Sequence, residues 1–238
     1  MLVLDAHAHC GLTLPMDVLQ PRWQQGNIDG GVIFSPVEEI YDRYDPYFVD
    51  DESYRKSREK VHSYIESLIS EHIYGYWFVW NDFALPGEPF VGIKWHRHSN
   101  EPKYKYDTEK CRDIIEHICT RRLPVVLEEE FHHTLEMVEK INNRTIIIIP
   151  HFGALNGGYS RLKEADLFEN PMIFVDTALA SPGEIKDFAA DYGVQRILFG
   201  SDFPFGEPAR ERLKVERIFT GKKRKKVLGE NLLELLER

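Results

Sequence analysis

The 238-residue sequence has few cysteines and no apolar run long enough to span a bilayer. Its three cysteines, Cys10, Cys111 and Cys119, form an odd set without the spacing of a disulfide framework, which is typical of a reducing compartment. A strand-like run follows Met1 almost directly and leaves no room for a signal peptide. We therefore expect a cytoplasmic protein that does not contact a membrane.

An excess of positive charge is also missing. Lys and Arg together number 30 against 39 Asp and Glu, which gives a formal net charge of -9. Nucleic-acid binding depends on a basic patch, so we expect no nucleic-acid partner. The one basic run, KKRKK at 222–226, precedes an amphipathic segment and is predicted to be a solvated helix start. A small-molecule substrate is the expected partner, and the sequence leaves open whether the chain forms a homo-oligomer.

Eight short runs rich in β-branched and aromatic residues recur along the chain, and most are continuously apolar, as strands buried on both faces are. The runs begin at or near Val3, Gly30, Ile73, Phe90, Leu123, Thr145, Met172 and Arg196. Segments with helical periodicity follow most of them, including an apolar stripe within 107–122 and a capping box with a helix-starting proline at 181–184. The third run is followed only by NDFALPGEP, which is too short and too proline-rich for a full helix.

This alternation, without a linker or an internal repeat, predicts an α/β fold in which residues 1–238 form a single distorted (β/α)8 TIM barrel. An open doubly wound sheet is the alternative. Such a sheet would more often carry a glycine-rich phosphate loop after the first strand, and the sequence has none there.

Two histidines lie one residue apart in DAHAHC, at the end of the first run. Alternate side chains of a strand point to the same side, so His7 and His9 should face one site, which is the geometry that a metal-binding pair requires. Taken alone, the motif is also consistent with two hydrogen-bonded histidines at a strand end.

Other polar side chains also fall at the ends of predicted strands. In a barrel, the carboxyl ends of the strands converge on the active site. The side chains at these ends that can bind a metal or a proton are His7, His9, Lys94, Glu128, His151 and Asp202. Their joint occurrence predicts a convergent polar site, and imidazole and carboxylate ligands suit zinc, manganese or iron. Strand alternation predicts that Glu129 points away from this site.

Five motifs resemble the amidohydrolase superfamily, specifically its amidohydrolase-2 branch of metal-dependent hydrolases and decarboxylases. They are DAHAH, GIK, IPHFG, LFGSDFPFG and KVLGENLLELL, which span nearly the whole chain in the expected order. The resemblance implies a distorted TIM barrel in which His7, His9 and Asp202 bind the metal. It also implies that His151 is either a ligand or the group that polarises the substrate.

The fifth strand departs from this family. The family usually carries a histidine at its end, whereas PVVLEEE places Glu128 there; a carboxylate can bind one metal or bridge two. Lys94 is predicted to face the substrate or to be a buried paired lysine, with a carboxylated bridging lysine as the alternative. His96 and His98 could form a second ligand pair, but we place them in a loop beyond the fourth strand, where Arg97 is a candidate substrate contact.

The sequence therefore predicts a metal-dependent hydrolase that acts on a small amide, ester or lactone. We expect a divalent metal, zinc in one or two copies, held by His7, His9, Glu128, His151 and Asp202. Asp202 would take a proton from the metal-activated water and His151 would polarise the carbonyl, while Lys94 and Arg97 would bind the substrate.

Three alternatives remain open at this stage. The first is a metal-dependent decarboxylase of a small carboxylated substrate, for which Lys94, Arg97 and Arg161 are candidate contacts. The second is a TatD-like nuclease, although such a nuclease would carry a glutamate on the fourth strand, where this chain has Lys94. The third is a barrel that binds metal without catalysis. The Tyr- and Asp-rich segment 37–51 lies on the predicted catalytic face, as a lid, a solvated loop or a subunit contact.

Overall fold

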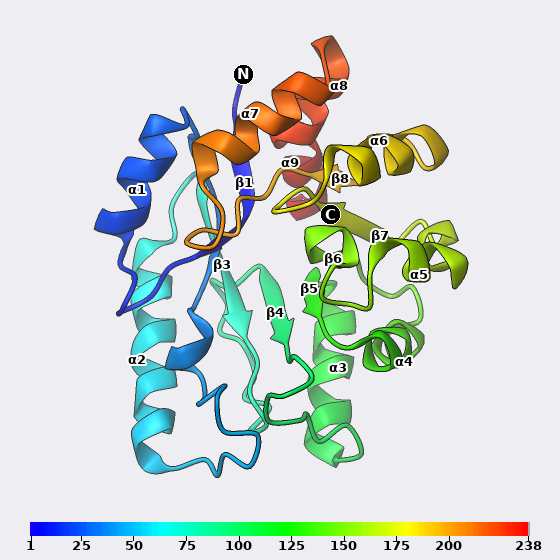
Figure 1. The fold of residues 1–238 in the computed structure, drawn as a ribbon. Helices are drawn as coiled ribbons and strands as arrows, with labels where there is room; N and C mark the ends of the chain where they lie inside the picture. The colour runs from blue at the N-terminus through cyan, green and yellow to red at the C-terminus, as the bar shows by residue number, and fades with distance from the viewer. Residues whose placement is uncertain (238) are drawn as a thin grey trace.

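Eight parallel strands form one sheet in which sequence neighbours pair in chain order, β1 to β8 (Figure 1). The structure is a computed structural model and describes residues 1–237, so Arg238, the last residue of the predicted domain, lies outside the described residues. The strands are β1 (Leu4–His9), β2 (Gly30–Phe34), β3 (Ile73–Phe78), β4 (Gly92–His96), β5 (Val125–Glu128), β6 (Ile147–Ile149), β7 (Ile173–Asp176) and β8 (Ile197–Leu198).

The sheet closes on itself between β1 and the segment that follows β8. The backbone N–H of Ala6 donates to the carbonyl of Phe199 at 2.7 Å, and that of Asp202 donates to the carbonyl of His7 at 2.7 Å. The register of β1 against β2 shifts between Asp5 and Ala8, and β8 has only two residues, which distorts the ring. The predicted single (β/α)8 barrel is confirmed.

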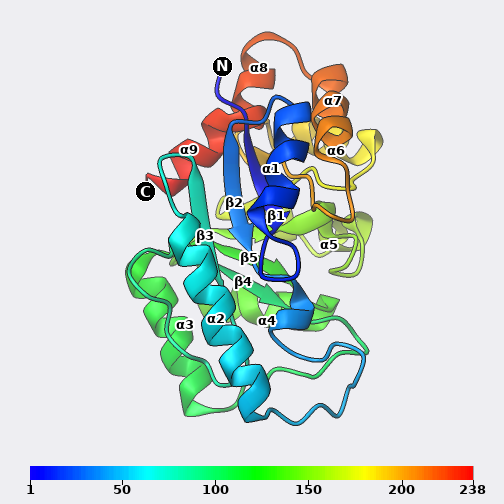
Figure 2. The same cartoon turned by 90° about the vertical axis from the view of Figure 1, so that its left-hand side faces the viewer.

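Helices surround this sheet. They are α1 (Met16–Gln25), α2 (Glu52–Leu68), α3 (Glu109–Arg121), α4 (Phe131–Ile141), α5 (Tyr159–Glu164), α6 (Pro182–Asp191), α7 (Pro208–Ile218), α8 (Gly221–Lys225) and α9 (Asn231–Leu236). Figure 2 shows α2 lying along the outside of β3. The predicted capping box starts α6, because the Ser181 hydroxyl accepts from the N–H of Glu184 and the Glu184 carboxylate accepts from the N–H of Ser181. Among the described residues no helix joins β3 to β4, as predicted.

Apolar side chains fill the barrel interior. This cluster combines Leu4 and Phe34 from the first strands with Val126 and Ile148 from β5 and β6, and α9 adds Leu232. The outer faces of the strands pack on the helices in a second, larger cluster. The buried polar groups discussed below are therefore confined to the carboxyl ends of the strands.

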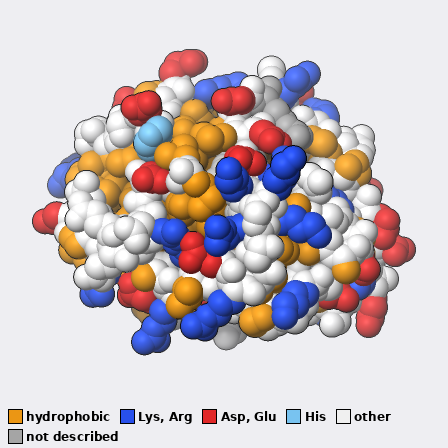
Figure 3. Space-filling view, turned by 90° about the horizontal axis from the view of Figure 1, so that it is seen from above, with side chains coloured by type: hydrophobic (Ala, Val, Ile, Leu, Met, Phe, Trp, Pro, Cys, Tyr) orange, Lys and Arg blue, Asp and Glu red, His pale blue; other side chains and the backbone are white. Residues whose placement is uncertain are grey.

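The basic run lies in and directly after α8, as predicted, with Lys222, Lys223 and Lys225 exposed. The face of the molecule that lies at the top of Figure 1 is seen in Figure 3. It mixes Lys and Arg with acidic and apolar side chains rather than presenting one basic surface. Within residues 1–237, the structure has no helix with both the length and the apolar character needed to cross a membrane.

Candidate metal centre

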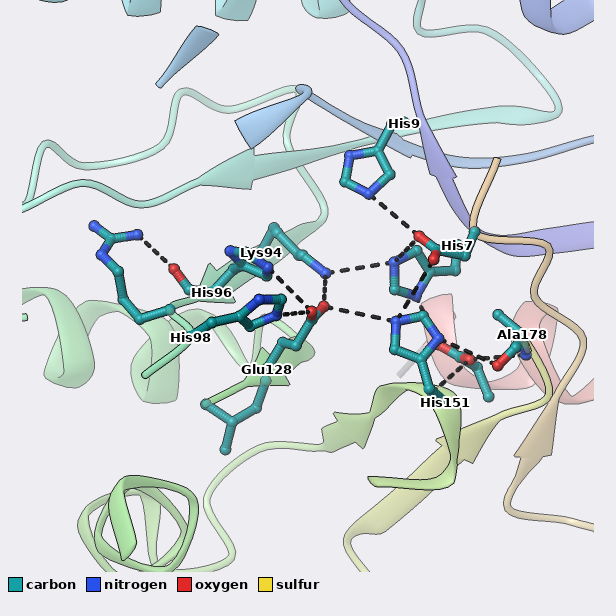
Figure 4. A network of polar contacts seen from close by, with 12 residues as sticks. His7, His9, Lys94, His96, His98, Glu128, His151 and Ala178 are labelled. Atoms are coloured by element: carbon teal, nitrogen blue, oxygen red, sulfur yellow. Dashed lines mark hydrogen bonds and ion pairs between the residues drawn. The ribbon is translucent and has the colours of Figure 1, made fainter. Parts of the chain in front are cut away.

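The six side chains predicted from the strand ends lie together at one end of the barrel. Figure 4 labels five of them, His7, His9, Lys94, Glu128 and His151. All six are buried, with exposed fractions of 0 to 5%: His7, His9, Lys94, Glu128, His151 and Asp202. His7 and His9 belong to β1, Lys94 to β4 and Glu128 to β5. His151 and Asp202 lie in turns after β6 and β8 and both have a φ of 54°, in the left-handed region.

His7 and His9 direct their Nε2 atoms to the same oxygen, Asp202 Oδ1, each at 3.3 Å. Their other nitrogens face oxygen atoms that only accept hydrogen bonds: His7 Nδ1 lies 2.8 Å from Asp176 Oδ2, and His9 Nδ1 lies 3.1 Å from the carbonyl of Ser35. Each Nδ1 is therefore the donor, which leaves each Nε2 lone pair directed at the carboxylate.

This geometry fits a metal ion. Two lone pairs and an ionised oxygen do not bond to one another, but ligand atoms about 2.1 Å from an ion at tetrahedral angles lie about 3.4 Å apart. The separations of 3.3 Å from Asp202 Oδ1 to His7 Nε2 and His9 Nε2 match this edge length. Burial raises the pKa of Asp202, but the contacts of its carboxylate with His7, His9 and His151 lower it overall to about 2.

His151 faces both carboxylates of the site. Its Nδ1 donates to the carbonyl of Ala178 at 3.2 Å, and its Nε2 lies 3.8 Å from Glu128 Oε2 and 3.8 Å from Asp202 Oδ2. Burial lowers the pKa of His151, but the nearby carboxylate of Glu128, with those of Asp176 and Asp202, raises it to about 9. In this position His151 can either complete a ligand set or donate a proton.

Glu128 stands between two groups of residues. Its Oε2 accepts from Lys94 Nζ at 2.7 Å, while its Oε1 lies 3.0 Å from His96 Nε2 and 2.7 Å from His98 Nε2. Burial raises the pKa of Glu128, but His96, Lys94 and His151 hold it well below its usual range. The residue that replaces the expected fifth-strand histidine is thus an ionised carboxylate in contact with both groups.

Lys94 is the buried paired lysine that the sequence offered as one alternative. Its side chain is fully buried, and Nζ lies 3.4 Å from His7 Nε2 as well as 2.7 Å from Glu128 Oε2. Burial and then the charge of Lys94 lower the pKa of His7. Because Glu128 rather than Lys94 lines the pocket, this position does not support the predicted direct substrate contact by Lys94.

Arg97 lies outside the pocket. Its guanidinium carbon is 3.8 Å from the centre of the Tyr104 ring, 4.1 Å from that of Tyr41 and 4.8 Å from that of Trp80. The side chain is 1% exposed and its Nη1 donates to the carbonyl of His96. Enclosure by three aromatic rings argues against the predicted substrate contact and gives Arg97 a structural role.

The predicted loop position of His96 is wrong. His96 is the last residue of β4, is buried, and points to the same side of the strand as Lys94 because the two are separated by one residue. His98 does lie beyond the strand, yet its ring also reaches Glu128. Glu129 points away from the site, as predicted, and accepts from the Tyr106 hydroxyl at 2.7 Å.

Asp176 was missed by the sequence analysis. It is the last residue of β7 and is fully buried; besides holding His7 Nδ1, its Oδ1 accepts from the backbone N–H of His151 at 3.0 Å. Burial raises the pKa of Asp176, but His7 and His151 lower it overall. The strand-end rule that found the other groups applies equally to Asp176 and would have identified it.

A pocket of about 180 Å³ opens over these groups. Its polar lining includes His9, His96, His98, Glu128, His151 and Asp202, and its rim consists of Val37, Arg43, Leu155, Leu179 and Phe205. Segment 37–51 therefore shapes the pocket through Val37 and Arg43. A larger hollow of about 580 Å³ lies near the start of β5 and the end of α3, away from this chemistry, where Glu116 and Arg144 pair with each other.

Comparison with protein-family models and with curated proteins gives no match. The solved structures that are similar in fold include amidohydrolase 2 from Bifidobacterium longum subsp. infantis, with a TM-score of 0.67 and 16% identity over 100% of this chain and 99% of that one. A dihydroxybenzoic acid decarboxylase from a Polaromonas species, solved with manganese and an inhibitor, has a TM-score of 0.70 and 14% identity over 99% and 96% of the two chains.

A third similar structure is a probable 2-pyrone-4,6-dicarboxylic acid hydrolase from Acinetobacter baumannii, with a TM-score of 0.71 and 13% identity over 100% of both chains. At such low identity the likeness shows the fold, over the full length of the molecules. The chain thus has the (β/α)8 barrel fold of amidohydrolase-2 structures, as its motifs predicted.

Proposed function

We propose that the chain is a metal-dependent hydrolase of the amidohydrolase superfamily that acts on a small carbonyl compound. One observation carries the proposal: three buried histidines have Nδ1 fixed by an oxygen acceptor and turn Nε2 toward carboxylates in one pocket. A structural role does not require the Nε2 lone pairs of His7 and His9 to converge on one ionised oxygen, whereas a cation site does.

His7, His9 and Asp202 are the proposed ligands of a zinc ion, with Glu128 and His151 near enough to complete the set. The ligand atoms of His7, His9 and Asp202 lie within 4.8 Å of one another, and so do those of His7, Glu128 and His151. When bound, the ion would act as a Lewis acid and lower the pKa of a water molecule.

The two oxygens of Asp202 have different surroundings. Oδ1 faces His7 and His9, while Oδ2 faces His151 at 3.8 Å. Oδ2 is therefore the atom that can accept a proton from the attacking water and return it to the leaving group. The Nε2–H of His151, on the same side, would donate to the carbonyl oxygen as negative charge develops there.

The pocket favours a small substrate with an apolar part and an anionic group. Leu155, Leu179 and Phe205 are 45 to 64% exposed at its rim and would cover an apolar portion. The Arg43 side chain, 17% exposed, provides a guanidinium at the same rim, where Nη2 donates to Glu101 Oε1 at 2.7 Å. Arg43 thus takes the role of anion contact that the sequence had given to Lys94, Arg97 and Arg161.

Decarboxylation of a carboxylated substrate is a second candidate, and the position of Arg43 favours it. A guanidinium can hold a carboxylate in a bidentate contact, and the protonated His151 would then deliver a proton to the carbon that loses CO₂. One of the structures with this fold is a decarboxylase of dihydroxybenzoic acid, and another carries the name of a dicarboxylic acid hydrolase. Measuring CO₂ release separately from hydrolysis on carboxylated lactones and aromatic acids distinguishes the two reactions.

The proposal is tested by Asp202→Asn in the zinc-reconstituted protein. On any substrate found in a screen of small lactones, amides and esters, we expect turnover to be abolished and the circular dichroism to be unchanged. His132→Gln, an exposed substitution in α4, is the matched control and should keep wild-type turnover. Near wild-type turnover of Asp202→Asn would show that Asp202 is not the base.

A further inference from the structure

A second pair of histidines, His96 and His98, lies on the opposite side of Glu128 from His7 and His151 (Figure 4). Both rings direct Nε2 at a single oxygen, Glu128 Oε1, at distances of 3.0 and 2.7 Å. His7 and His9 also direct their Nε2 atoms at one oxygen, Asp202 Oδ1, at 3.3 Å each. The barrel therefore contains two histidine pairs of the same spacing, each aimed at one carboxylate oxygen.

We propose that His96, His98 and Glu128 bind a second divalent cation. Two imidazoles and a carboxylate suit ions of borderline character, such as Zn²⁺, Co²⁺ or Ni²⁺, better than Mg²⁺ or Ca²⁺. The Nε2 atoms of His96 and His98 lie about 0.4 and 0.7 Å closer to Glu128 Oε1 than ligand atoms around an ion do, so the side chains would move apart by roughly half an ångström when the ion binds. The side chain of His98, which is 28% exposed, lies on the pocket side and gives an ion access to the site.

The opposite edges of the two rings face a second buried carboxylate. Glu101, which is 4% exposed, has Oε2 3.6 Å from His96 Nδ1 and Oε1 3.7 Å from His98 Nδ1. The Tyr41 hydroxyl bridges this contact, since it lies 3.2 Å from His96 Nδ1 and donates to Glu101 Oε2 at 2.6 Å. Histidines that bind metals commonly donate their other N–H to a carboxylate of this kind.

Ion binding at His98 also has a consequence for Arg43. Arg43 Nη2 now lies 3.2 Å from His98 Nδ1 and can only donate to it, so that the proton of His98 sits on Nε2 and points to Glu128. Coordination through Nε2 requires the proton on Nδ1, and Glu101 Oε1 is the nearby acceptor for it. The ion would therefore release the guanidinium of Arg43 from His98 toward the pocket.

Two cations oppose the second ion. Lys94 Nζ lies 2.7 Å from Glu128 Oε2, and Arg43 Nη2 lies 2.7 Å from Glu101 Oε1. Because Glu128 and Glu101 are each paired with a Lys or Arg side chain, we expect this site to bind more weakly than the site of His7, His9 and Asp202. Within the described residues, the ion-pair partners of Asp202 are histidines only.

Zinc stoichiometry tests the inference without any activity assay. Metal-free protein is dialysed against buffered Zn²⁺ up to saturation, and zinc and protein are quantified. We expect about two ions per chain for the wild type and about one for His98→Gln, since each ion requires its own ligand set. The control His132→Gln, which removes an exposed histidine, should keep the wild-type value.

If His98→Gln binds as much zinc per chain as the wild type, the second site is overturned. Failure of the proposed function would give a different result. If His7, His9 and Asp202 bind no ion, His9→Gln keeps the wild-type zinc content, while His98→Gln still loses one ion. If His98→Gln does not fold, His98→Cys titrated with Co²⁺ decides: a thiolate charge-transfer band supports coordination at position 98, and its absence overturns it. The three native cysteines are buried, and the spectrum of the wild type titrated with Co²⁺ gives their contribution for subtraction.

Discussion

Asp176→Asn is the most informative single substitution for the support of the proposed centre. Asp176 is fully buried, holds His7 Nδ1 at 2.8 Å through Oδ2 and accepts from the backbone N–H groups of His151 and Ala178 through Oδ1. Asparagine has nearly the same shape, so the backbone contacts can persist through its carbonyl oxygen. What is lost is the negative charge that keeps the His7 proton on Nδ1 and its Nε2 lone pair free.

Loss of such a supporting carboxylate typically weakens metal affinity about 10- to 100-fold. This corresponds to about 1.4 to 2.8 kcal/mol of binding free energy, because each tenfold change is worth about 1.4 kcal/mol. The assay is competition for Zn²⁺ against a chromophoric chelator. Asp187→Asn, the same substitution in a surface pair with Lys163 on α5, should leave the affinity unchanged. Wild-type affinity in Asp176→Asn would refute the claim that His7 binds an ion through Nε2.

Three further outcomes follow from the contacts described above. Arg97→Gln should lower the free energy of unfolding by about 2 kcal/mol, because a desolvated cation between aromatic rings is lost. KM should stay at the wild-type value, and a raised KM would show that Arg97 does contact the substrate. Arg43→Gln should raise KM for an anionic substrate at least about tenfold with little change in kcat, and equal KM values would place the anion elsewhere. The pKa of His151 is raised to about 9 in the folded state, so its contribution to stability is present below pH 6.5 and is lost as the pH rises through about 9. Denaturant unfolding of metal-free protein should show this alkaline loss, and His151→Gln should not.

The apolar runs predicted the barrel well, because seven of the eight strands are buried along their whole length and all are short enough to be recognised from local sequence. The strand-end rule also found six of the groups that meet at this end of the barrel. It failed for His96 because Lys94 was taken as the end of the fourth strand, although alternation places both side chains on one face. Asp176 ends the seventh strand, so it satisfies the same rule.

Contacts made by loops could not be read from the sequence. Arg43 and Glu101 reach the histidine pair from separate connections, and their approach depends on how segment 37–51 packs against the loop after β4. The enclosure of Arg97 likewise needs rings from the separate connections that hold Tyr41 and Trp80, in addition to Tyr104 of its own loop. A cation in a polar stretch such as KWHRHSN looks exposed until these segments are placed around it.

The central claim is that His7, His9 and Asp202 hold a divalent ion, and diffraction at the zinc absorption edge from crystals grown with Zn²⁺ tests it most directly. The expected result is an anomalous peak about 2.0 to 2.2 Å from His7 Nε2, His9 Nε2 and an oxygen of Asp202. A zinc-saturated crystal with no peak at these three atoms would contradict the claim.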